Sequence, residues 1–146
     1  ISPRYHVHRH GRTSSARPRP AGLPDQVENC ARVYQELRRR GMRVLVGGDY
    51  GFAWTPHGTN ARDLHHFVKW FGYSPEEALV CATINGARAM QMEDRIGRIS
   101  DGYLADMLIV QGRPHEDVSC ISAGKILAVL KDGRPHGERS RDRAEP

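Results

Sequence analysis

Long apolar runs are missing from this sequence of 146 residues. A membrane-spanning helix needs about 20 consecutive apolar residues, and no stretch of the chain approaches that length. The N-terminus also lacks the apolar segment that a secretory signal peptide carries. We therefore expect no membrane partner and a cytoplasmic location. An initiator methionine is missing as well, since the chain begins at Ile1, and we interpret this as a sign that upstream sequence is absent.

Cysteine is scarce. The three cysteines, Cys30, Cys81 and Cys120, are odd in number, lie far apart and form no CxxC pair. Cys30 and Cys81 fall on the apolar faces of predicted helices. Because free cysteine behaves as a small buried hydrophobic residue, we expect free, buried thiols in a reducing compartment.

Lysine is rare too, so the net charge of +5 comes mainly from arginine. Much of this positive charge lies near the two ends of the chain, in the runs 17–19 and 139–143. No aromatic residues alternate with these charges, and no nucleic-acid-binding module is recognisable. We therefore expect no nucleic-acid partner.

The composition separates the middle of the chain from its two ends. Residues 1–24 are rich in Arg, Pro and His, and residues 137–146 are mostly charged. Segments with so few large apolar side chains cannot offset the entropy cost of ordering. We expect both ends to be flexible and the part between them to be globular.

A helix followed by a buried strand opens the globular part. Asp25 and Glu28 have the spacing of a capping box, and the apolar residues that follow recur at helical spacing, which predicts a helix over 25–40. The apolar run 42–46 is typical of a strand buried on both faces, as in a parallel sheet. Asp49 then stands at the carboxyl end of this strand, where α/β barrels carry catalytic groups.

Two more helices and several strands are predicted downstream. One helix begins near Asn60, and another follows Ser74, where Glu77 completes a capping box, and continues to Met90. After Arg95 the apolar period changes to that of strands. The predicted strands are 96–99, 105–110 and 126–130, and the Asp132-Gly133 pair that follows them is a hairpin signal.

Seven short motifs follow one another through the globular part. They are GGDYG at 47–51, TPHGTN at 55–60, SPEEAL at 74–79, ATINGA at 82–87, IG at 96–97, GYLAD at 102–106 and KDGR at 131–134. In this order they resemble the amidohydrolase superfamily, in its imidazolonepropionase- and prolidase-like branch. The resemblance implies an α/β fold, the C-terminal portion of a (β/α)8 TIM barrel with part of a small β-sandwich domain. Residues 25–92 would then belong to the barrel and residues 93–136 to the β-sandwich.

The resemblance also implies a site and a reaction. Members of that superfamily hold one or two divalent metals, often zinc, with His ligands on several strands and an Asp on the eighth strand. Carried onto this sequence, only that aspartate is present, as Asp49, at the end of a strand over 42–49. It would bind metal and accept a proton from the activated water. His57 resembles a loop histidine over the barrel mouth that touches substrate. The implied reaction is hydrolysis of a carbon–nitrogen bond in a small amide, cyclic amide or dipeptide.

Most of that active site is missing from this sequence. A complete barrel takes about 200–250 residues, so we interpret the chain as a fragment that expects the remainder of the barrel, or other copies, as its partner. One alternative is a catalytically silent polypeptide that only associates with other chains. A second is a small basic protein that binds metal or nucleic acid through His6, His8 and His10, which lie too close in sequence to Asp49 to be the HxH motif of a first barrel strand.

Overall fold

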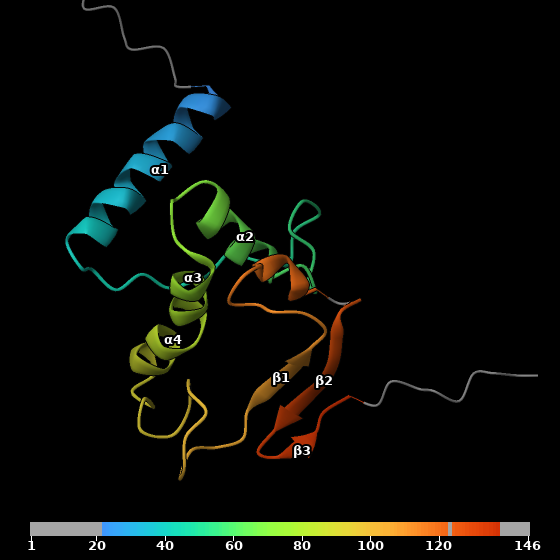
Figure 1. Ribbon diagram of the computed structural model, residues 1–146. Helices are drawn as coiled ribbons and strands as arrows, with labels where there is room; N and C mark the ends of the chain where they lie inside the picture. The colour runs from blue at the N-terminus through green and yellow to red at the C-terminus, as the bar shows by residue number, and fades with distance from the viewer. Residues whose placement is uncertain (1–21, 123, 138–146) are drawn as a thin grey trace, which may run out of the picture.

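The computed structural model describes residues 22–122 and 124–137. Within them, helices precede a small antiparallel sheet (Figure 1). The elements are α1 (Leu23–Arg39), α2 (Arg62–Lys69), α3 (Pro75–Ala82), α4 (Ile84–Ala89), β1 (Met107–Val110), the 3₁₀ turn η1 (Val118–Cys120), β2 (Ile126–Lys131) and β3 (Arg134–Pro135). Nearly all of the two ends that we expect to be flexible lies outside the described residues. No helix in the described ranges is long and apolar enough to cross a membrane.

Helix α1 confirms the first predicted helix but begins at Leu23 rather than Asp25. The predicted capping box between Asp25 and Glu28 is wrong. Gly22 is the N-cap, and the Asp25 carboxylate accepts a hydrogen bond from the Gly22 N–H at 3.1 Å. The acidic side chain at the third helical position is therefore Asp25, and it satisfies a backbone donor that the helix itself leaves unpaired.

Residues 42–49 form no strand in the described part of the chain, contrary to prediction. The physical reason is that a strand exists through hydrogen bonds to neighbouring strands, and no described segment forms such backbone pairing with this one. Its side chains nevertheless alternate as in a strand. Val44 and Val46 pack against the core, whereas Leu45 is 45% exposed. The Asn85 amide fixes this segment to α4 by donating to the Val44 carbonyl at 3.0 Å.

The next two predicted helices are present with different bounds. Helix α2 begins at Arg62, not Asn60. The capping box of α3 is confirmed, since the Glu77 N–H donates to Ser74 Oγ at 3.2 Å and the Ser74 N–H donates to Glu77 Oε2 at 2.8 Å. The helix predicted to continue to Met90 is interrupted at Thr83. There the hydroxyl donates to the Leu79 carbonyl at 2.7 Å, a local bond that bends helices.

The core lies where α2, α3 and η1 meet. Phe67 is only 4% exposed, and its ring contacts Tyr34, Phe71 and Tyr73 at centroid distances of 5.6, 5.6 and 5.1 Å. The other buried members of this cluster are Leu64, Ala78, Cys81 and Val118. Aromatic contacts of this kind stabilise by about 0.5–1.5 kcal/mol each beyond the burial of apolar area.

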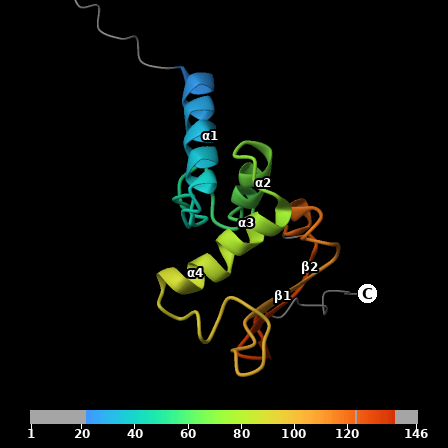
Figure 2. The ribbon, with the colours of Figure 1, turned by 60° about the vertical axis from the view of Figure 1, so that its left-hand side comes forward.

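The apolar face of α1 is covered on one side only. Tyr34 stacks on Phe71 with ring centroids 4.1 Å apart. Further along this face, Cys30 is exposed, so the prediction that it is buried is wrong, whereas Cys81 is buried as expected. Figure 2 shows α1 standing away from the sheet with no described element along its outer side. The apolar face of α1 therefore packs against other described residues over only part of its length.

The sheet has the order β1-β2-β3, with both pairs antiparallel. The predicted Asp132-Gly133 hairpin is confirmed, and both residues have positive φ, 51° and 75°. The predicted strand over 96–99 is wrong. Gly97 in its middle has φ +93° and lies so close to α4 that an added Cβ would be 2.8 Å from Ala87 Cβ. This left-handed conformation is not that of a strand.

The Asp106 carboxylate ties β2 to the segment before β1. It accepts bonds from Lys131 Nζ and from the Asp132 N–H. The lysine bond, and then the backbone bond, lower the pKa of Asp106. This geometry agrees with a structural role for Asp106. The boundary between a barrel part at 25–92 and a β-domain part at 93–136 stays a prediction.

Glu77 joins α3 to α1 and provides a pH test of the fold. Its carboxylate lies 2.8 Å from the Arg38 guanidinium. Burial acts to raise the pKa of Glu77, but bonds from Ser74 and Arg38 outweigh it, and the pKa is lowered. A carboxyl with a lowered folded pKa contributes stability that is present above its unfolded pKa and is lost as the pH falls through the folded pKa.

We therefore expect Glu77→Gln to lower Tm at pH 7 by several degrees, about 4 °C if the loss of the Arg38 ion pair and of the negative charge at the α3 N-terminus costs ~1 kcal/mol. Between about pH 5 and pH 3, Tm should fall less in the variant than in the wild type. Circular dichroism melts measure both, with the exposed Glu76→Gln as a matched control. The same acid-induced fall in Glu77→Gln and wild type would show that this carboxylate does not carry the pH dependence.

Candidate active site

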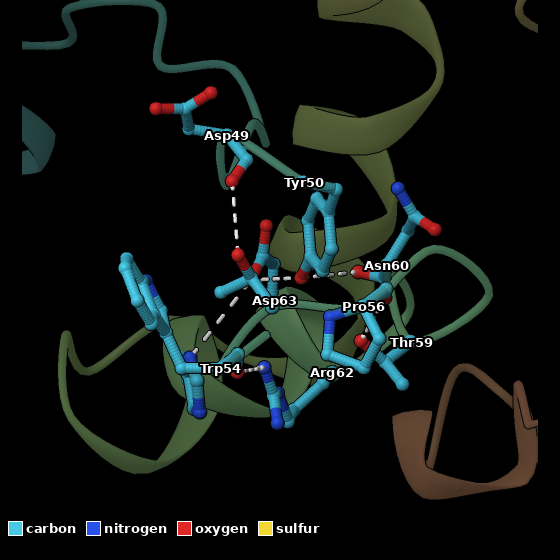
Figure 3. Close-up of polar contacts among 10 residues, drawn as sticks. Asp49, Tyr50, Trp54, Pro56, Thr59, Asn60, Arg62 and Asp63 are labelled. Carbon is cyan, nitrogen blue, oxygen red and sulfur yellow. Dashed lines mark hydrogen bonds and ion pairs between the residues drawn. The ribbon is translucent and has the colours of Figure 1, made fainter. Parts of the chain in front are cut away.

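Asp49 stands at the start of the loop that leads from the 42–48 segment to α2. Its backbone has φ +48°, which is uncommon for a residue other than glycine. The carboxylate is exposed and makes no hydrogen bond or ion pair with the described residues, while the Asp49 carbonyl accepts a bond from Thr55 Oγ1 at 3.1 Å. In Figure 3 the carboxylate points away from the polar contacts of the loop. It is therefore available to bind a ligand.

A tight turn follows Asp49. The Gly51 N–H donates to the Thr55 carbonyl at 2.8 Å, and the Thr55 N–H donates to the Phe52 carbonyl at 3.1 Å. Phe52 and Thr55 form an isolated antiparallel bridge. Since Thr55 also binds the Asp49 carbonyl, this turn and the Asp49 backbone are held together as one unit.

Tyr50 and Asp63 anchor this unit to α2, a contact that sequence reasoning missed. The Tyr50 hydroxyl donates to Asp63 Oδ1 at 2.6 Å (Figure 3). Burial, and then the bond to Asp63, raise the pKa of Tyr50. The space beside the pair is filled, because a Cβ added to Gly48 would lie 2.4 Å from Asp63 Oδ2. Two features of the sequence bear on this contact: Tyr50 lies in the GGDYG motif, and Asp63 is an acidic residue in the first turn of a predicted helix.

The structure brings His57 into the same loop as Asp49. The ring lies against the backbone of Gly51, where an added Cβ would be 3.2 Å from His57 Nε2. His57 is exposed, as a substrate-contacting residue must be. By contrast, His66 lies on α2, where its Nδ1 is 3.9 Å from Asp63 Oδ1. The triplet His6, His8 and His10 lies outside the described residues.

The donor chemistry of Asp49 suits a divalent metal, since carboxylates bind zinc at about 2.0–2.2 Å. A catalytic zinc site needs about three protein ligands. No group of three His, Cys, Asp or Glu that could hold a metal occurs within residues 22–122 and 124–137. The described part of the chain therefore provides one candidate ligand, and a complete set needs side chains from outside it.

Comparisons with known proteins agree with each other. A family model described as "Amidohydrolase family" matches residues 12–135. The imidazolonepropionase of Symbiobacterium thermophilum is 33% identical over 105 residues, which cover 69% of this chain and 25% of that protein. The ochratoxinase of Aspergillus niger is 27% identical over 132 residues, 84% of this chain and 27% of that protein.

Solved structures show the same likeness. A putative prolidase from Bifidobacterium longum superposes with a TM-score of 0.69 at 26% identity, covering 74% of this chain and 26% of that chain. A Xaa-Pro dipeptidase with bound methionine in the active site superposes with a TM-score of 0.64 at 29% identity, covering 74% and 25%. The chain thus spans about a quarter of the length of the relatives it matches.

Proposed function

Because this chain belongs to the amidohydrolase family, we propose that it forms the C-terminal part of a (β/α)8 barrel and provides a metal-binding aspartate, Asp49. Residues 42–49 would be the last barrel strand. The observation that carries this proposal is an exposed carboxylate, without a partner among the described residues, at the end of a segment with strand-like alternation. The remaining strands and ligands would come from polypeptide outside the described residues.

The proposed reaction is hydrolysis of a carbon–nitrogen bond in a small amide, cyclic amide or dipeptide. The relatives named imidazolonepropionase, ochratoxinase and Xaa-Pro dipeptidase support this substrate class. Asp49 would accept a proton from the water that attacks the carbonyl carbon, and the same carboxyl can return that proton to the leaving nitrogen. A bound divalent metal, proposed to be zinc, would polarise the carbonyl. His57 would contact the substrate.

The test is metal-dependent turnover. With excess zinc, the isolated chain should not hydrolyse a panel of amides and dipeptides above background, because Asp49 alone is too few ligands. A complete barrel that contains this chain should be active, lose activity with a chelator and regain it with zinc. No zinc-dependent turnover in the complete barrel would refute the proposed function. Turnover by the isolated chain that Asp49→Ala abolishes would show that this chain, or its oligomer, assembles the whole site.

His57→Ala should have a milder effect in the complete barrel. We expect KM to rise about tenfold with little change in kcat, because a residue that only touches substrate contributes equally to the ground state and the transition state. Steady-state kinetics at saturating metal measure both constants. His65→Ala, an exposed histidine on α2, is the matched control. A fall in kcat with KM unchanged would instead place His57 in the chemical step.

A further inference from the structure

Two large aromatic side chains are stacked in the open beside the Asp49 turn. The rings of Phe52 and Trp54 are nearly parallel, with an interplanar angle of 5° and centroids 5.3 Å apart. Phe52 is 48% exposed and Trp54 is 74% exposed. Neither belongs to the core around Phe67. Burying aromatic side chains of this size against a ligand is strongly favourable. A solvent-exposed aromatic pair beside Asp49 is therefore suited to bind a ligand.

The geometry ties this pair to Asp49. Phe52 is bridged to Thr55, whose hydroxyl binds the Asp49 carbonyl at 3.1 Å. The Trp54 carbonyl accepts a bond from Arg62 at 3.4 Å, which joins the turn to α2. Figure 3 shows Trp54 and the Asp49 carboxylate on one side of the loop, and Asn60 and Thr59 on the other. These contacts hold the aromatic pair and Asp49 in the same hydrogen-bonded turn.

We propose that Phe52 and Trp54 bind a flat apolar group of the substrate, so that the preferred substrates are amides with an aromatic group next to the scissile carbon–nitrogen bond. This inference rests on the proposed function and names its substrate class. The chemistry favours an aromatic group because parallel or tilted ring contacts add to the burial of apolar area. Among the described residues, Arg62 is the one cationic side chain that hydrogen-bonds to this turn. Its guanidinium donates to the Trp54 carbonyl.

Ligand binding tests the stacked pair of Phe52 and Trp54 without any turnover. In the full chain with Trp70→Phe, Trp54 is the single tryptophan, so its fluorescence reports on this loop. N-benzoylglycine should quench it saturably, with a Kd about tenfold lower than that of N-acetylglycine. Phe52→Ala should remove most of this difference, and Phe52→Tyr, which keeps the ring, should retain it. Equal affinity for the two probes, or no saturable quenching by N-benzoylglycine, would overturn the proposal.

Kinetics in the complete barrel separate this proposal from the proposed function. Trp54→Ala should lower the ratio of kcat/KM for N-benzoylglycine to that for N-acetylglycine about tenfold, and Trp70→Ala, a partly exposed tryptophan after α2, should leave this ratio unchanged. Asp49→Asn should lower kcat/KM for both substrates by at least about 10³-fold but keep the fluorescence difference. If the proposed hydrolysis is wrong, the difference in affinity between the two probes remains. If the aromatic pair does not bind substrate, hydrolysis of both substrates remains. An unchanged ratio in Trp54→Ala would overturn the aromatic preference.

Discussion

Asp49→Asn, in a complete barrel that contains this chain, is expected to lower kcat/KM by at least about 10³-fold. Asparagine keeps the size of the side chain and one oxygen that can face a cation. It removes the negative charge that would attract the proposed metal and the basicity that would accept a proton. Loss of a general base costs about 10²–10⁴-fold by itself, and weaker metal binding adds to that loss. Folding should be preserved, because the exposed carboxylate makes no contact with the described core.

Steady-state kinetics at saturating zinc measure this effect, and circular dichroism checks the fold. Metal content after dialysis is a second readout and should be lower in the variant. Asp101→Asn, an exposed turn aspartate beyond α4, is the matched control and should change neither. Near-wild-type activity in folded, metal-loaded Asp49→Asn would remove the assignment of Asp49 to the reaction.

Phe67→Ala is expected to lower the free energy of unfolding by about 3–5 kcal/mol, the usual cost of deleting a buried aromatic ring. Phe67 is 4% exposed and contacts three other aromatic rings. Its removal therefore leaves a cavity between α1 and α2 and breaks contacts that join the two helices.

Urea denaturation followed by circular dichroism measures this loss. Trp70→Ala, three residues further along the chain, is the control, because Trp70 is 46% exposed and its ring contacts the Lys69 ammonium at 4.8 Å. We expect that variant to lose less than about 1 kcal/mol. Equal losses in the two variants would mean that the aromatic cluster around Phe67 is not the centre of the core.

Local signals predicted local structure well. The Ser74–Glu77 box and the Asp132-Gly133 hairpin are both present, because each depends on contacts between residues close together in the sequence. The helix over α1 was predicted from periodicity, and only its cap was misplaced. The interruption between α3 and α4 at Thr83 was not predicted. The spacing of apolar residues does not show that the Thr83 hydroxyl bonds to the helix backbone.

Strands were predicted less well, because a strand requires a partner. The run 42–46 has the composition of a buried strand, but no described segment pairs with it. Residues 96–99 have the right pattern, but Gly97 adopts a left-handed conformation against α4. In both segments the pattern of side chains was visible in the sequence, and the presence of hydrogen-bonding neighbours was not.

The sequence by itself determined the family, the local helices and turns, and the two loop residues Asp49 and His57 as candidates, because ordered motifs and short-range bonds carry that information. Only the tertiary structure decided that Tyr50 is held by Asp63, thirteen positions away. It alone also decided that Phe52 and Trp54 stack in the open rather than pack in the core. These contacts depend on how the turn after Asp49 folds against α2, and no spacing of residue types along the chain encodes that packing.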